Sequence, residues 1–235
     1  MGLGRKIHNL LHPALGQVLM FHQVVEHIGP QPEAPRLEVT VDFFTQTLDT
    51  LLKQGVDFIG MDQVAERLRT RPRHPFVCLT FDDGYLDTYT LAYPALKERN
   101  IPFCVYMTRD FYRGKAKPHW NPSADMMDVR QLMELGSDPL CTIGAHTCSH
   151  PHLSRLPDVE QKAELEACKT DLEQVLGKAV QHMAYPYGDY TPKTLEMVYD
   201  LGFETAVTTS GRPVRDDSKL LELDRVLVHE RSENN

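Results

Sequence analysis

The sequence predicts an α/β fold, a distorted (β/α) barrel of about seven or eight strands, in a single domain that covers residues 1–235. Short apolar runs alternate with amphipathic stretches along the chain, and this alternation is typical of repeated β-α units. The apolar runs are rich in β-branched residues and barely alternate with polar ones, as expected of parallel strands covered on both faces. Eight such runs in 235 residues favour a barrel over an open sheet.

The expected elements follow one another in a regular order. Strands are expected at residues 17–22, 56–60, 76–81, 102–108, 140–146, 182–188, 204–209 and 225–229. Helices are expected at residues 40–55, 61–70, 89–100, 128–136, 157–177 and 191–202, and a further short helix before the first strand. Thr40 is the expected N-cap of the first of these six helices, and Gly55 and Gly177 are expected to end two of them.

Composition and charge limit the classes of partner. The formal charge is -8, from 25 basic and 33 acidic residues, so bulk charge does not favour nucleic acid or anionic membranes. No apolar run approaches the roughly 18 residues of a membrane span. The five cysteines form no C-x-x-C pair, which indicates buried free thiols and a reducing compartment. We therefore expect a cytoplasmic location, with export or envelope association as the alternative.

Polar residues recur where the expected strands end. Asp82 and Asp83 follow the strand at 76–81, His146 ends the strand at 140–146, and His150 comes four residues later. In a β/α barrel the reactive groups lie at such strand ends, on one face. Two histidines and one carboxylate can hold a divalent metal and leave positions open for water. The second carboxylate can then take a proton from that water, an arrangement typical of metal-assisted hydrolysis.

Each motif also has a structural interpretation when taken alone. Asp-Asp-Gly is typical of a turn. His146 and His150 fall on one side of a helical turn at i, i+4 spacing, but eleven histidines make chance pairs common. The two motifs at matching strand ends together favour a metal site.

The motifs "LTFDDGYLDTY", "IGAHTCSHPHLSRL" and "AYPYG" resemble those of the NodB-like polysaccharide deacetylases. The resemblance extends to "VLMFHQV", "AYPALKERNIPFCVYMT" and "LDRVLVHE", and covers about 200 residues. It implies a distorted barrel, a divalent metal that is usually zinc, and removal of an acetyl group from an N-acetylated sugar. Carbohydrate is therefore the expected partner.

The resemblance also implies roles for single residues. The metal ligands would be Asp83, His146 and His150, and Asp82 would be the general base. His229 would protonate the leaving amine, the backbone N–H of Tyr187 would bind the oxyanion, and Leu227 would line the pocket for the acetyl methyl group.

Two positions depart from the family pattern. Many members have an arginine that orients the catalytic aspartate where this chain has Ala184. Arg225 is a candidate replacement, although a surface arginine at a strand start is an equal alternative. Many members also have a tryptophan that walls the pocket near Val129, and here Trp120 is a candidate substitute, with packing as the alternative. Trp120 lies in an irregular segment, residues 112–127, which is a candidate functional loop.

Four further residues near the motifs carry weaker signals: His22 is interpreted as a core or supporting histidine, His152 as the cap of a turn, and Asp87 and Tyr89 as supporting or helix-starting residues. The alternatives to an N-deacetylase are an O-acetyl esterase or another amidohydrolase on the same scaffold, and a glycan-binding protein with impaired catalysis. Inside a cell, a precursor in a surface-glycan pathway would be the accessible substrate.

Overall fold

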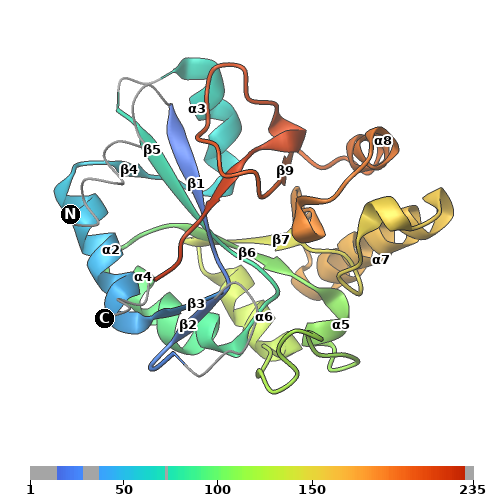
Figure 1. The fold of residues 1–235 in the computed structure, drawn as a ribbon, viewed down its shortest axis with the longest axis horizontal. Coiled ribbons are helices and arrows are strands. Elements are labelled where there is room, and N and C mark those ends of the chain that lie inside the picture. Colours follow the sequence, from blue (N-terminus) through green and yellow to red (C-terminus); the bar gives the residue numbers. More distant parts are fainter. Residues whose placement is uncertain (1–14, 29–36, 72–73, 231–235) are drawn as a thin grey trace, which may run out of the picture.

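The computed structural model describes residues 15–28, 37–71 and 74–230. The short helix expected before the first strand lies outside these residues. Eight strands form one sheet in which all paired neighbours are parallel. Strands occupy the centre of the molecule and the longer helices lie around them (Figure 1). The predicted α/β fold is confirmed.

The strand order is β10-β1-β5-β6-β7-β8-β9, with β4 also paired to β5. The bounds are β1 Gly16–Phe21, β4 Asp57–Phe58, β5 Phe76–Phe81, β6 Phe103–Met107, β7 Cys141–Ala145, β8 His182–Ala184, β9 Thr205–Val207 and β10 Arg225–Leu227. Each corresponds to an expected strand. The largest difference is at β8, which stops at Ala184 because Pro186–Gly188 forms a 3-10 turn.

The edge strands β9 and β10 nearly close the sheet into a barrel. Leu223 forms a parallel bridge with Val207, and the N–H of Gly211 donates to the carbonyl of Arg225 at 3.0 Å. The segment between β9 and β10 therefore spans the gap between the two edges. The middle of this segment lies at the start of β1, where Val214 forms a bridge with Gly16.

Two short strands were not expected. β2 Gln23–Val25 and β3 Glu38–Thr40 form a separate parallel pair. Each has only three residues, too few for a periodic pattern. β2 follows β1 after a single residue, His22, so this pair lies close to the end of β1.

The helices agree with the sequence pattern at most positions. They are α2 Val41–Lys53, α3 Val64–Thr70, α4 Tyr93–Glu98, α5 Arg109–Tyr112, α6 Val129–Ser137, α7 Asp158–Leu176 and α8 Pro192–Asp200. The Thr40 side chain caps α2 by accepting from the N–H of Phe43, and Gly177 ends α7 in the left-handed conformation with φ 66°. The expected helix at 89–100 begins as a π turn, Thr88–Ala92, before α4, and α5 was not expected.

A hydrophobic core fills the space between α2 and the sheet. The rings of Phe21 and Phe44 lie 5.2 Å apart edge to face, and those of Phe21 and Phe81 are stacked at 5.4 Å.

All five cysteines are buried and free, as expected. Within the described part of the chain, no helix has the length and apolar character needed to cross a bilayer.

Helix α2 provides a test of this packing. Leu48 is fully buried and Leu52, one turn later, is 42% exposed. Leu48→Ala should lower the free energy of unfolding by about 2–5 kcal/mol, because it removes buried methyl groups and leaves a cavity. Leu52→Ala, the matched control, should change it by less than about 1 kcal/mol. Urea denaturation measures the free energy of unfolding of both variants. Equal losses of stability would contradict the burial of Leu48 and the exposure of Leu52 in α2.

Candidate metal centre and active site

The two aspartates stand where the backbone leaves β5. The N–H of Asp82 still donates to the carbonyl of Phe21 at 3.1 Å, and the chain then turns through Asp83 at φ 71° and Gly84 at φ 82°. A Cβ at Gly84 would lie 2.7 Å from the Met107 Cε, so a side chain there would clash as well as resist the positive φ. The sharp turn gives the two adjacent carboxylates different neighbours.

Three side chains meet as the expected ligand group. The Oδ1 of Asp83 lies 3.6 Å from the Nε2 of His146 and 3.4 Å from the Nε2 of His150. All three ligand atoms lie within 4.8 Å of one another, and the three residues are buried. The Nδ1 of His146 is 2.8 Å from the carbonyl of Ala184, which fixes its proton on Nδ1 and leaves Nε2 free as a ligand.

The histidines do not meet through a helical turn, and this part of the sequence interpretation was wrong. Residues 146–150 form a non-helical loop in which Thr147 and His150 have φ values of 64° and 62°. The N–H of His150 donates to the Oγ1 of Thr147 at 3.1 Å, which stabilises the loop. The predicted pair does meet, but a loop brings His146 and His150 together and not a helical turn.

The chemistry of this group fits a divalent cation. Both oxygens of Asp83 are buried, and the ion-pair contacts of this carboxylate among the described residues are His146 and His150. Burial and the neighbouring charge of Asp82 raise the pKa of Asp83 well above its ordinary value. Burial lowers the pKa of both His146 and His150, so both are neutral and can donate a lone pair. A bound cation would keep this buried carboxylate ionised between the two neutral imidazoles, and this ligand set suits zinc.

The neighbouring aspartate, Asp82, is paired with the guanidinium group of Arg225. The Arg225 Nη1 lies 2.6 Å from the Oδ1 of Asp82 and Nη2 lies 2.7 Å from its Oδ2, a bidentate pair. Burial alone would raise the pKa of Asp82, but the charge and hydrogen bonds of Arg225 outweigh it and hold this pKa below its ordinary value. Asp82 is therefore ionised at neutral pH, as a general base must be.

Arg225 orients Asp82, the role that the family pattern gives to an arginine where this chain has Ala184. It is fully buried on β10 and points into the barrel, where its Nε also donates to the carbonyl of Thr208 at 3.0 Å. Its guanidinium lies over the ring of Tyr106, 5.4 Å from the centroid. The alternative of a surface arginine is excluded by this burial.

His22, interpreted from the sequence as a core or supporting histidine, lies beside the carboxylate of Asp82. Its Nε2 lies 4.0 Å from the Oδ2 of Asp82, and burial lowers its pKa to about 4. Phe21 and Phe81 are register partners, so His22 and Asp82 follow neighbouring strands at the same level. That parallel register was the signal in the sequence that could have placed His22 beside Asp82.

His229, the expected acid, is exposed, and no interaction found among the described residues joins it to the cluster.

Aromatic side chains wall the metal centre. The rings of Trp120 and Tyr187 each lie 4.6 Å from that of His150, and 6.2 Å from each other. The Trp120 Nε1 donates to the hydroxyl of Tyr85 at 2.9 Å, so Tyr85, which the sequence analysis did not single out, fixes this wall. Leu227 is half-buried in register with Met20 on β1, and its place in an acetyl pocket stays a prediction.

Two of the four supporting residues of the sequence analysis, His152 and Asp87, are connected to these walls. His152 stacks on Tyr187 with 4.0 Å between ring centroids. Asp87 accepts from the Nε2 of Gln23 at 3.0 Å, and the Gln23 Oε1 accepts from Asn121, next to Trp120. Burial raises the pKa of Asp87 to about 7. Tyr89 lies apart from this network and stacks on Tyr93 in α4.

The comparisons with known proteins agree with this geometry. A family model described as polysaccharide deacetylase matches residues 69–206, more than half of the chain and a segment that contains Asp82, Asp83, His146 and His150. The chain belongs to the polysaccharide deacetylase family. This deacetylase is 26% identical over 218 residues to YxkH of Bacillus subtilis, whose name places it in the same family; the match covers 92% of this chain and 72% of YxkH.

Solved structures share the barrel of this deacetylase. The Streptococcus pyogenes deacetylase PplD, determined in complex with acetate, is 27% identical with a TM-score of 0.79, over 91% of this chain and 92% of PplD. IcaB from Ammonifex degensii is 28% identical with a TM-score of 0.76, over 92% of each chain. The chain is thus a metal-dependent hydrolase of the carbohydrate deacetylase type, as the motifs predicted.

Substitution of Asp83 and substitution of Asp82 should each reduce the activity of the deacetylase, but for different reasons. Asp83→Asn removes an anionic ligand, so zinc affinity should fall and excess zinc should partly restore activity. Asp82→Asn should keep the metal and lose the base, so added zinc should not help. A zinc titration of activity, with bound metal measured in parallel, tests this. Rescue of Asp82→Asn alone would mean that the roles are exchanged.

Arg225 should set the pH dependence of the base. Arg225→Lys keeps a positive charge but loses the two-pronged contact, so the pKa of Asp82 should rise. Because the base must be ionised, the acidic limb of the kcat profile should move to higher pH, with bound zinc unchanged. Arg99→Lys, an arginine paired with Asp49 outside the site, is the control. An unshifted acidic limb in Arg225→Lys would remove Arg225 from the control of Asp82.

Proposed function

We propose that this deacetylase hydrolyses the N-acetyl amide of a sugar unit in a glycan and releases acetate. The observation that carries the proposal is the pair Asp82 and Asp83, adjacent in sequence and placed in opposite electrostatic environments. One carboxylate faces two neutral histidines, and the other is held ionised by Arg225. A ligand and a base side by side are the requirements of hydrolysis by activated water.

Asp83, His146 and His150 are proposed to hold zinc. When bound there, the ion supplies Lewis-acid polarisation of the acetyl carbonyl and lowers the pKa of water. The protein supplies the orientation of the ligands, through the hydrogen bond of His146 to Ala184 and the loop at His150. The rings of Trp120 and Tyr187 flank this group, each 4.6 Å from the ring of His150.

Asp82 is proposed to accept the proton of the attacking water. Its two oxygens are fixed by Arg225, so the carboxylate can take up a proton without turning. The carbonyl oxygen gains negative charge during the attack and needs a donor. The backbone N–H of Tyr187 is proposed for this, because Tyr187 takes a left-handed turn with φ 60° beside His150.

His22, in place of His229, is proposed to pass a proton to the leaving nitrogen. Its Nε2 is 4.0 Å from the Oδ2 of Asp82 and its low pKa leaves it neutral and able to accept a proton there. The leaving amine then takes that proton as the C–N bond breaks. His229 lies exposed beyond β10, where the described contacts give it no route to Asp82.

The location of the enzyme decides which glycans it meets. A cytoplasmic location, inferred from the sequence, is kept as a proposal and fits a nucleotide-linked or lipid-linked precursor. An envelope location fits a finished surface glycan. Fractionation of the source cells followed by immunodetection separates the two.

Acetate release is the test of the activity. The purified chain should release acetate from N-acetylated sugars, offered as monosaccharides, lipid-linked sugars and oligomers, more readily with added zinc than with a chelator. His22→Ala should lower kcat by about 10²–10⁴, and His229→Ala should change it less than about twofold, with bound zinc unchanged in both.

Faster release from O-acetylated sugars in the same assay would assign an esterase in place of the amidase. The reverse ranking of the two histidine variants would return the acid role to His229. Release that is unaffected by a chelator would contradict the metal.

A further inference from the structure

A carboxylate on helix α7 contacts the loop that carries two of the expected metal ligands. Glu164 reaches from α7 to residues 148 and 149, which lie between His146 and His150 in the chain. Its Oε2 accepts from the N–H groups of Cys148 at 2.8 Å and Ser149 at 2.9 Å, and its Oε1 accepts from the Ser149 hydroxyl at 2.7 Å. Three donors of the metal-ligand loop, residues 146–150, thus meet a single carboxylate that has no part in the proposed proton transfers.

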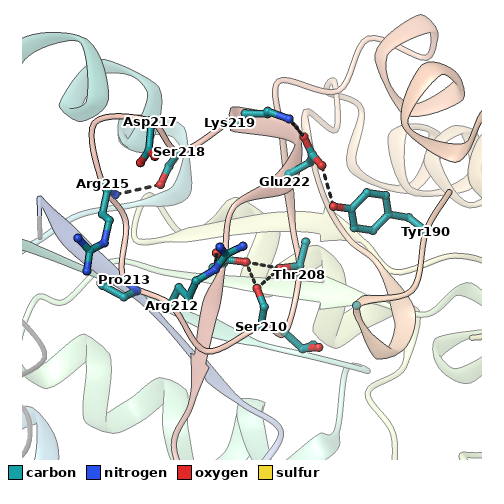
Figure 2. A pocket seen from close by; sticks show the side chains of 13 residues that line it. Tyr190, Thr208, Ser210, Arg212, Pro213, Arg215, Asp217, Ser218, Lys219 and Glu222 are labelled. Atoms are coloured by element: carbon teal, nitrogen blue, oxygen red, sulfur yellow. Dashed lines mark hydrogen bonds and ion pairs between the residues drawn. The ribbon is translucent and has the colours of Figure 1, made fainter. Parts of the chain in front are cut away.

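This contact differs from the ion pairs that line other parts of the molecule. The cavity shown in Figure 2 lies beside Tyr187, because Gly188 is part of its lining. There the Glu222 carboxylate pairs with the Lys219 ammonium group at 2.9 Å, and one side chain is fixed to another. The carboxylate at the metal-ligand loop instead fixes two consecutive peptide groups, and so it fixes the course of the backbone itself.

The backbone of the metal-ligand loop has the form that presents N–H groups to an anion. Thr147 has φ 64° and His150 has φ 62°, and the two N–H groups between these residues point to the same carboxylate. Successive N–H groups in such a turn make a concave site for an anion. A hydrogen bond to a carboxylate is about twice as strong as one between neutral groups. Glu164 therefore supplies, from within the chain, the anion that this turn accommodates.

The carbonyl groups of the same loop bond elsewhere, to the start of helix α5. The N–H of Arg109 donates to the carbonyl of Thr147 at 3.1 Å, and the N–H of Asp110 donates to the carbonyl of Cys148 at 2.9 Å. The metal-ligand loop is therefore held by α5 through its acceptors and by α7 through its donors. Loss of the acceptor on α7 should leave the loop attached through its carbonyl groups but free to turn about them.

A cavity of about 410 Å³ opens at this contact, and Cys148, Ser149 and Glu164 are part of its lining. Because side chains do not fill this space, packing contributes less to the position of the loop and the polar contact contributes more. The cation of the lining, Arg109, is paired with Asp110 through its Nε at 3.0 Å and its Nη2 at 2.9 Å. The donors of the loop, and not this cation, are thus the partners found for Glu164 among the described residues.

We propose that Glu164 is a positioning residue of the metal centre, which holds His146 and His150 at the spacing that binds a divalent ion. It acts through the backbone of residues 148 and 149 and not by contact with the reacting atoms. Residues at positive φ persist only where their surroundings hold them, so without this anchor the loop should relax and the two imidazoles should separate. The proposal rests on the proposed zinc site and adds a residue that sets the affinity of that site.

The test measures metal binding directly on the purified, metal-free chain. Glu164→Ala removes the acceptor, and Glu164→Gln keeps its length and one carbonyl oxygen. The control, Glu166→Ala, removes an exposed carboxylate two residues further along the same helix. Competition with a chelating dye gives the affinity for Zn²⁺, and the visible absorption of the Co²⁺-loaded chain reports the arrangement of the ligands. The melting temperature of the metal-free chain, measured in parallel, reports the stability of the fold.

Glu164→Ala should lower the affinity for Zn²⁺ by about 10–100-fold, the usual effect of losing a partner that orients metal ligands. Glu164→Gln should lose less, and Glu166→Ala should change the affinity by less than about twofold. The Co²⁺ spectrum of Glu164→Ala should differ from that of the wild type even at saturation, because His146 and His150 are no longer held. Excess zinc should partly restore acetate release by this variant. A residue that only stabilised the fold would lower the melting temperature and leave the affinity and the spectrum of the folded chain unchanged.

Unchanged Zn²⁺ affinity and an unchanged Co²⁺ spectrum in both Glu164 variants would overturn the proposal, whatever their melting temperatures. If Glu164→Ala does not fold, Glu164→Gln decides the question, with an expected loss of affinity of at least about threefold. A wild type that binds neither ion would refute the proposed function and the role of Glu164 together. A wild type that binds zinc no more tightly than the Glu164 variants would refute the role of Glu164 alone.

Discussion

The buried ion pair between Arg225 and Asp82 is the interaction on which the rest of the site depends. Both side chains are removed from water inside the barrel, so each charge is stable there only because the other is present. Removal of one partner from such a pair costs about 3–5 kcal/mol. The same guanidinium donates to Thr80 and to the carbonyl of Thr208, and so joins β10 to β5 and to the end of β9. One residue therefore orients the base and helps to close the barrel.

The pair also explains why two adjacent aspartates can do different work. Asp82 receives a fixed cation from the protein, and Asp83 receives none and instead faces His146 and His150. Without a cation, burial drives Asp83 toward its protonated form. The protein thus supplies the counter-charge of Asp82 from Arg225 and gives Asp83 only His146 and His150, which suits the proposed roles of base and metal ligand. The turn through Asp83 and Gly84, both at positive φ, separates these two environments.

Backbone strain is concentrated at this centre. Asp83, Thr147, His150 and Tyr187 all take positive φ values, although none is a glycine. Each such residue costs on the order of 1 kcal/mol or more and persists only where its surroundings determine it. Here hydrogen bonds to Thr147 and from Thr209, and the stacking of His152 on Tyr187, hold the strained turns in place. The strain aims side chains and peptide groups at one point, which regular strands alone would not do.

The sequence by itself determined the order of β and α elements, the eight strands of the barrel, and the expectation that Asp83, His146 and His150 meet in a metal site. These follow from local patterns, because apolar runs, caps and short motifs depend on neighbours in the chain. Only the tertiary structure placed Arg225 on Asp82 and brought His22 instead of His229 to the base. It also showed the strands β2 and β3 and the cavity beside Tyr187. These features depend on which strands are neighbours and in what register, and on how a buried charge finds its partner across the barrel. Residues such as Asp82 and Arg225, 143 positions apart in the chain, meet for reasons of packing that no local pattern contains.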